Sequence, residues 1–370
     1  MSKQDSSRVP ELDGLRGLAI ALVVWRHLVE AYLPLGPSTW LGWVRAGTTL
    51  SWTGVDLFFV LSGYFIGGIL IDQRESPRLG RVFYLRRALR ILPLYFVTVL
   101  ACFIMAAAGW PDAFAEFPAW IYGVFFTNFA LVWLNHWDWA PLSVLWSLAV
   151  EEQFYLAAPW VVRALSPTRL PWLMAALIAV AWLLRLGAHL LFPDRELAVH
   201  VLMPMRMDNL ALGVLLAWAV RNVAAKPFFQ HLARSWPRWL AVCAFLLLVL
   251  TVDQPKIGDP ALVYGGYTVI ALTSALVVAI VVGVRPAGLM RVLRSTPLLS
   301  LGRNSYFIYL WHSLIGVELI KWLGGPAFVL NRFSSLLIVL LACGATWAAS
   351  LISGRFFETP LIALGHRHRY

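Results

Sequence analysis

Apolar residues along this chain are gathered into long runs, which short polar or basic connections separate. Several runs reach the roughly 18 to 20 residues that an α-helix needs to cross a hydrocarbon core about 30 Å thick. The pattern therefore predicts an all-α, polytopic membrane protein. The runs cover residues 17–34, 50–71, 91–109, 118–134, 142–162, 170–192, 198–220, 237–252, 261–283, 303–321 and 333–353.

Basic residues indicate which connections face the cytoplasm. Residues 72–90 contain six arginines, and the connection around Arg163 and Arg169 is also basic. Because lysine and arginine are enriched in cytoplasmic loops, both connections are predicted to be cytoplasmic. An even number of crossings must then separate them, although three apolar runs lie between them.

The run at residues 118–134 is the one that does not fit a crossing. It is flanked by Asp112, Glu116 and Asp138 and is rich in tryptophan, phenylalanine and asparagine, which is typical of a re-entrant or interfacial segment. Without it, about ten transmembrane helices remain, and both termini are predicted to be cytoplasmic. The expected location is the cell inner membrane.

The composition agrees with this assignment and narrows the partners. Of 370 residues, 60% are hydrophobic and 13% are charged, about half the charged share of a soluble domain. The net charge of +11 could indicate nucleic acid, but most lysines and arginines fall in predicted cytoplasmic connections, so we expect the lipid bilayer and no nucleic acid as a partner. Three separated cysteines indicate no disulfide framework and no metal site. No connection is long enough to form another domain, so residues 1–370 are predicted to form a single transmembrane domain.

An arginine and a histidine share one face of the first predicted span. In "GLRGLAIALVVWRHL", Arg16 and His27 are eleven residues apart, a rotation of about 1,100° that leaves them within roughly 20° and ~16.5 Å apart along the axis. Two interpretations stay open: the face holds the anionic group of a long donor at the cytoplasmic mouth, or His27 is a packed histidine and Arg16 a topological anchor. Arg26 is expected to pair with Asp56 or Glu30.

Three arginines open the third span, in "RVFYLRRALRILPLY". Arg87 and Arg90 are adjacent on one helix face, with Arg86 beside them. A planar guanidinium binds phosphate through two hydrogen bonds, so the segment is a candidate seat for a phosphorylated cytoplasmic cofactor. Contact with lipid headgroups is the alternative.

Several acidic residues lie within apolar runs, where an ionised group costs at least ~2.5 kcal/mol. Asp56 in "GVDLFFVLSGYFIGG" is expected to have a partner or to line a wet cavity. Glu151 and Glu152 are adjacent and cannot share one helix face, so they are predicted to have different roles. One of them could pair with an arginine or orient the catalytic histidine.

Two further spans carry candidate residues. Arg206 and Asp208 in "PMRMDNLALG" are predicted to form a local pair. "GRNSYFIYLWH" places His312 at the middle of the membrane, where we interpret it as a packed histidine rather than a catalyst.

Taken together, these motifs resemble acyltransferase family 3, the membrane proteins that include O-antigen and peptidoglycan O-acetyltransferases. The resemblance covers nearly the whole chain. It rests on "ELDGLRGLAIALVVWRHL", "GVDLFFVLSGYFI", "FYLRRALRILPLY", "WSLAVEEQFYL", "LGRNSYFIYLWH" and "FFETP", in this order.

The resemblance implies transfer of an acyl group, most often acetyl, from cytoplasmic acetyl-CoA to a hydroxyl of a sugar or cell-surface glycan. It implies that Arg16 and His27 are the essential pair, and that Glu151 belongs to the active centre. Arg87 and Arg90, with Arg86 beside them and Arg16 at the mouth, are then expected to bind the acyl-CoA. The chain shows no Gly-Asp-Ser motif of the fused SGNH domain that some relatives carry.

Three questions stay open from the sequence. His27 could act as a general base or form an acyl-histidine. The acceptor could be a glycan, a glycolipid, another lipid or a secreted small molecule, with or without a separate periplasmic partner chain. Charged residues inside spans also occur in proton- or anion-coupled transporters, which is the rival function without transferase activity.

Overall fold

The computed structural model describes residues 9–36, 39–110, 117–252, 254–325 and 327–370, and helices are the regular elements of this part of the chain. Seven helical segments are long and apolar enough to cross a membrane. The prediction of an all-α, polytopic membrane protein is thereby confirmed, while the count of about ten spans stays a prediction. The seven segments are Trp40–Asp72, Leu79–Ala107, Leu170–Leu191, Glu196–Arg221, Val223–Thr251, Leu262–Val284 and Phe333–His366.

These segments contain most of the long helices. They are α2 (Trp40–Gly47), α3 (Gly54–Asp72), α4 (Leu79–Ala107), α9 (Leu170–Leu191), α10 (Glu196–Val201), α11 (Met203–Arg221), α12 (Lys226–Thr251), α13 (Tyr267–Ala279), α18 (Phe333–Ser353) and α19 (Thr359–His366), with π-helical turns at Leu262–Gly266, Ile280–Val284 and Gly354–Glu358. The remaining helices are α1 (Pro10–Val24), α5 (Ala119–Gly123), α6 (Thr127–Leu134), α7 (Ala140–Ser143), α8 (Leu145–Ala164), α14 (Ala287–Leu293), α15 (Thr296–Arg303), α16 (Ser305–Trp311) and α17 (Glu318–Gly324).

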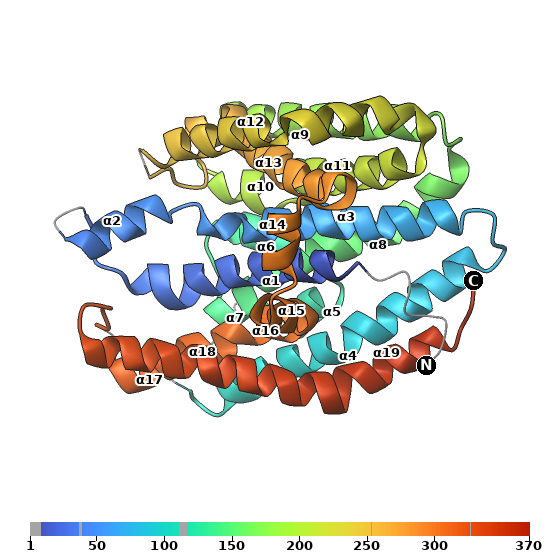
Figure 1. Cartoon of the computed structure of the whole chain (residues 1–370). Coiled ribbons are helices and arrows are strands. Elements are labelled where there is room, and N and C mark those ends of the chain that lie inside the picture. The colour runs from blue at the N-terminus through green and yellow to red at the C-terminus, as the bar shows by residue number, and fades with distance from the viewer. Residues whose placement is uncertain (1–8, 37–38, 111–116, 253, 326) are drawn as a thin grey trace.

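Three helices from the predicted spans are not among the seven apolar segments, and they are α1, α8 and α16. They carry or adjoin the candidate residues Arg16, Glu151 and His312. Figure 1 shows α1 in the middle of the bundle, between α3 on one side and α4 and α18 on the other. Helix α1, which carries Arg16, thus lies inside the bundle, where neighbouring helices separate it from lipid.

Glycines set the closest approaches between helices. A Cβ atom at Gly63 of α3 would lie 2.1 Å from the carbonyl oxygen of Leu210 on α11, and one at Gly302 of α15 would lie 1.8 Å from that of Asp13 on α1. Any larger residue would push the backbones apart. These contacts hold α11 against α3, and α15 against the helix that carries Arg16.

The segment 118–134 forms two short helices rather than a crossing. The chain turns between α5 and α6 at Phe125, whose φ is 57°, and α6 rises only about 12 Å. Gln153 of α8 donates a hydrogen bond to the Phe125 carbonyl oxygen at 3.0 Å, which satisfies the backbone at the break. This agrees with a re-entrant or interfacial segment. Asp112 and Glu116, which flank it in the sequence, lie outside the described residues.

Candidate active site

Two histidines from opposite parts of the chain lie ring against ring. His27 lies in the π-helical turn Trp25–Val29 that follows α1, and His312 begins a second π-helical turn, His312–Val317, after α16. The ring centres are 4.8 Å apart, and His27 Nδ1 lies 3.2 Å from His312 Nε2. Turns of this kind are frequent at functional sites.

This contact changes the interpretation of His312. The sequence favoured a packed histidine, and the side chain is indeed fully buried, but its ring packs against the candidate catalytic ring. Nothing in the spacing of "GRNSYFIYLWH" could indicate this, because the two histidines are 285 positions apart.

Arg16 lies in a separate group of charges. It interacts electrostatically with Glu151, Tyr155 and Arg87, and Arg90 of α4 interacts with Arg16 and Arg87. Three of the predicted donor-binding arginines therefore come together, and we call Arg16, Arg87 and Arg90 the arginine cluster. Arg16 and His27 make their contacts with different groups, and the π-helical turn that contains His27 alters the rotation expected for an unbroken α-helix.

Arg86 makes its hydrogen bonds with the C-terminal segment, although it shares with its neighbour Arg87 electrostatic interactions with His366 and Tyr370. Its Nε and Nη2 donate hydrogen bonds to the His368 carbonyl oxygen at 3.1 and 2.5 Å, and its guanidinium carbon lies 4.7 Å from the centre of the Tyr370 ring. Consecutive residues of an α-helix are rotated by about 100°. Arg86 therefore contacts the C-terminal segment, while its neighbour Arg87 points to Tyr155 of α8 inside the helix bundle.

Glu151 is the acidic neighbour of the arginine cluster. Tyr155 donates its hydroxyl to Glu151 Oε2 at 3.0 Å and also contacts the Ser62 hydroxyl of α3. The Arg87 guanidinium carbon lies 5.8 Å from the centre of the Tyr155 ring. Glu152 interacts electrostatically with Glu151 and Arg87, but its Oε1 has no hydrogen-bond partner among the described residues.

Helix α8 connects the arginine cluster to the histidines. Ser147 and Glu151 are one helical turn apart and share a face. The Ser147 hydroxyl lies 2.5 Å from that of Tyr309, whose ring centre is 6.0 Å from the ring centre of His312. Glu151, Ser147, Tyr309 and His312 thus form a series of neighbouring polar side chains between the arginine cluster and the two imidazoles, and we call this series the polar route.

The acidic residue Glu358 was missed as a candidate. It interacts electrostatically with Arg90 and Arg16, and its Oε1 accepts a hydrogen bond from Ser353 at 3.1 Å. The sequence held one signal for it, because "FFETP" is among the family-like motifs. Tyr155, Tyr309 and Ser147 carried no separate signal, since aromatic and hydroxyl residues are common in every span.

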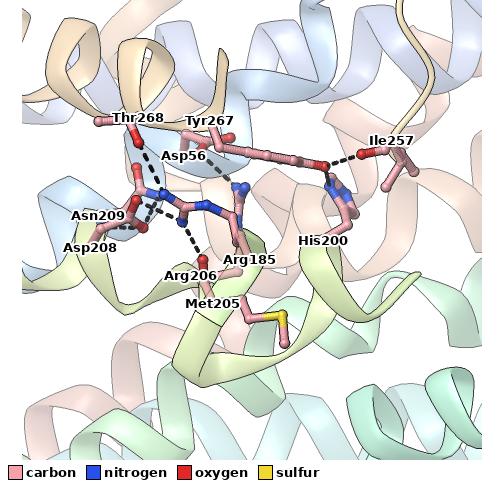
Figure 2. A network of polar contacts seen from close by, with 10 residues as sticks. All are labelled: Asp56, Arg185, His200, Met205, Arg206, Asp208, Asn209, Ile257, Tyr267 and Thr268. Carbon is pink, nitrogen blue, oxygen red and sulfur yellow. Dashed lines mark hydrogen bonds and ion pairs between the residues drawn. The ribbon is translucent and has the colours of Figure 1, made fainter. Parts of the chain in front are cut away.

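A second group of buried charges joins α3, α9 and α11 (Figure 2). Arg206 donates to Asp56 Oδ1 at 2.6 Å, and Arg185 pairs with Asp208 at 2.8 Å. Arg206 and Asp208, predicted to form a local pair, interact electrostatically, but each makes its ion pair with a residue of another helix, because residues two apart on a helix point to different sides. The expectation that Asp56 has a partner is confirmed. Arg26, in turn, pairs with Glu30.

The same group includes an aromatic layer. Tyr267 of α13 donates its hydroxyl to the Ile257 carbonyl oxygen at 2.9 Å, and His200 Nδ1 lies 3.1 Å from that hydroxyl. The Arg206 guanidinium carbon lies 4.9 Å from the centre of the Tyr267 ring. Figure 2 shows these side chains converging between the helices. Two arginines thus face two aspartates, and the ion pairs connect α3, α9 and α11.

Comparison with known proteins assigns the chain to a family. A family model described as an acyltransferase domain matches residues 9–355. The chain belongs to acyltransferase family 3. This confirms the resemblance drawn from the motifs.

Curated members of acyltransferase family 3 are similar over almost the whole chain. Peptidoglycan O-acetyltransferase OatA of Listeria monocytogenes is 28% identical over 95% of this chain and 56% of its own length. O-acetyltransferase OatA of Staphylococcus aureus is 26% identical over 97% and 58%. The chain thus spans a little more than half the length of these relatives. No solved structure matches it significantly.

Proposed function

We propose that this acyltransferase family 3 member transfers an acyl group, preferentially acetyl, from cytoplasmic acyl-CoA to a hydroxyl of a cell-surface glycan. The names of the relatives support O-acetylation and, for one of them, peptidoglycan as the acceptor. The observation that carries the proposal is the polar route from the arginine cluster, along Glu151 and Ser147 on α8, to the His27–His312 pair.

The arginine cluster suits the donor. CoA carries several phosphate charges, and guanidinium groups bind phosphate with short, charge-assisted hydrogen bonds. Arg16, Arg87 and Arg90 come from two helices, so they present donors from two directions. Asp13, Glu151 and Glu358 balance the three cations and allow them to lie together without a ligand.

His27 supplies the chemistry in either of two routes. As a general base, it takes the proton of the acceptor hydroxyl while that oxygen attacks the thioester carbonyl carbon; a C–O bond forms, the C–S bond breaks, and the thiolate recovers the proton. As a nucleophile, its free nitrogen attacks the same carbon and the C–S bond breaks to release CoA thiolate. The acyl group then passes from the imidazole nitrogen to the acceptor oxygen as the N–C bond breaks, and the hydroxyl proton goes to the thiolate. Both routes require a neutral imidazole with a free lone pair.

The membrane arrangement is part of the same proposal. We place residues 1–370 in the cell inner membrane as a single domain of about ten spans with cytoplasmic termini. Support comes from the basic connections and from the break of 118–134 into two short helices. A cysteine introduced at exposed Arg81 should react with a membrane-impermeant maleimide only after the membrane is opened.

Release of CoA thiol tests the activity. Purified protein in nanodiscs is given acetyl-CoA with and without peptidoglycan fragments, and wild type is compared with His27→Ala and with His231→Ala, an exposed histidine of α12. We expect release in wild type and in His231→Ala, and loss of at least two orders of magnitude in His27→Ala. Normal release in His27→Ala would overturn the proposal, and absence of both release and CoA binding would favour the transporter.

A further inference from the structure

The hydrogen-bond surroundings of His312 determine which of its nitrogens carries the proton. His312 Nδ1 lies 3.1 Å from the Ile308 carbonyl oxygen and 2.7 Å from that of Tyr309. A carbonyl oxygen only accepts hydrogen bonds, so Nδ1 must be the donor. In a neutral imidazole, Nε2 of His312 is then an acceptor. The Ser313 hydroxyl, 3.3 Å away, is one donor within its reach.

The hydrogen-bond partners of His27 place its proton in the same way. Its Nδ1 lies 3.0 Å from the Val23 carbonyl oxygen and 3.2 Å from His312 Nε2. Both neighbours are acceptors, so His27 Nδ1 must carry the hydrogen and donate it. The lone pair of the neutral ring then lies on Nε2. Two imidazolium rings with centres 4.8 Å apart would repel each other strongly at a buried site, which excludes the doubly charged pair.

We propose that His312 is a positioning residue that, together with the Val23 carbonyl oxygen, fixes His27 in the Nδ1–H tautomer and so leaves His27 Nε2 free to accept a proton or the acyl group. The inference rests on the proposed function for its chemical meaning, but the tautomer itself does not depend on any activity. In hydrolases that use a serine, a carboxylate does this work for the histidine. Here a neutral imidazole does it, which avoids an ionised group beside His27 inside the membrane.

His312 also stabilises the imidazolium form of His27 that arises during the reaction. When His27 Nε2 takes a proton, the ring becomes an imidazolium whose Nδ1–H points at the Val23 carbonyl and at His312 Nε2. Both acceptors favour the cation, and no other residue needs to move. Loss of the His312 acceptor therefore affects the chemical step, whereas the arginine cluster and donor binding stay as they are.

Nitrogen NMR of histidine-labelled protein in nanodiscs reads the tautomer directly. His27 signals are assigned by their loss in His27→Gln. We expect a protonated, pyrrole-type signal from His27 Nδ1 and a pyridine-type signal from Nε2 in the wild type. In His312→Leu the Val23 carbonyl oxygen is the acceptor that remains for His27 Nδ1–H, so the share of the Nδ1–H tautomer should fall. In His312→Gln, whose amide oxygen can accept the same hydrogen bond, the wild-type pattern should largely return.

Kinetics of the same variants supply the second readout. His312→Leu is expected to lower kcat by about 10²- to 10⁴-fold, the usual contribution of a positioned acid–base group, with the donor KM changed less than twofold. His312→Gln should recover at least tenfold of that loss. If His312→Leu does not fold, His312→Asn replaces it, because its shorter amide cannot reach His27 Nδ1.

Three results would overturn the inference. The first is an Nε2–H tautomer for wild-type His27, and the second is a tautomer unchanged in His312→Leu or its substitute His312→Asn. The third is a kcat loss in His312→Gln equal to that in His312→Leu or His312→Asn. The proposed function fails in a different way, through normal transfer by His27→Ala. The NMR experiment needs no turnover, so the two failures are distinguishable.

Discussion

Replacing Arg90 by glutamine tests whether the arginine cluster holds the donor. Arg90 interacts with Arg16, Arg87 and Glu358, so its loss removes repulsion from two cations and one attraction, and the fold should tolerate it. A hydrogen bond to a charged group contributes about 1.5 to 3 kcal/mol, and each 1.36 kcal/mol is tenfold. The Kd for CoA should therefore rise by about 10- to 150-fold.

Arg86→Gln is the matched control for this measurement. Arg86 lies four residues earlier on the same helix, where its guanidinium donates hydrogen bonds to the His368 carbonyl oxygen and stacks on the Tyr370 ring. Equilibrium binding of CoA to protein in nanodiscs should show a change below threefold for Arg86→Gln. Equal weakening in both variants would refute the reasoning, because it would mean that general positive charge, rather than the arginine cluster, attracts the donor.

Three further predictions concern the scaffold and the charge balance. Asp56→Asn leaves the fully buried Arg206 guanidinium without its ion-pair partner, so it should lower the free energy of unfolding by about 3 to 5 kcal/mol. The double change of Asp56 and Arg206 to leucine should recover most of this loss. Thermal unfolding in detergent measures the stability of both variants. Gly63→Ala should cost about 1 to 3 kcal/mol by overpacking, while Gly187→Ala, with open space around it, should be neutral or stabilising in the same assay. Glu358→Gln removes an acid beside the arginine cluster, so CoA should bind more tightly at low salt and lose that gain at 1 M salt, where charges are screened beyond about 3 Å; weaker binding at low salt would count against the charge-balance argument.

The sequence predicts features that lie within one segment. The cluster of arginines at the start of α4 follows from helical spacing, and the assignment of 118–134 to a non-crossing segment follows from counting basic connections. These features depend on local periodicity and on the charge of nearby loops, which a single sequence displays. Arg86 is the exception, because its direction depends on a C-terminal segment that packs on the same helix.

The sequence could not predict which residue of a distant helix pairs with each buried charge. Periodicity fixes which face of a helix is polar, but it does not say which helix covers that face. The pairs Arg206–Asp56 and Arg185–Asp208 cross between helices, although Arg206 has an acid, Asp208, two residues away. The π-helical turn after α1 adds to the difficulty, since one extra residue in a turn shifts everything that follows.

The protein keeps polar groups inside the bilayer in two different ways. At Asp56 and Arg206, each ion faces an opposite ion and the pair is completely enclosed. At the histidines the groups can stay neutral, because carbonyl oxygens and a second imidazole satisfy the ring nitrogens and leave one lone pair free. A neutral base costs little to bury and becomes charged only while it reacts, so the chemistry can be placed deep in the membrane without a permanent ion beside it.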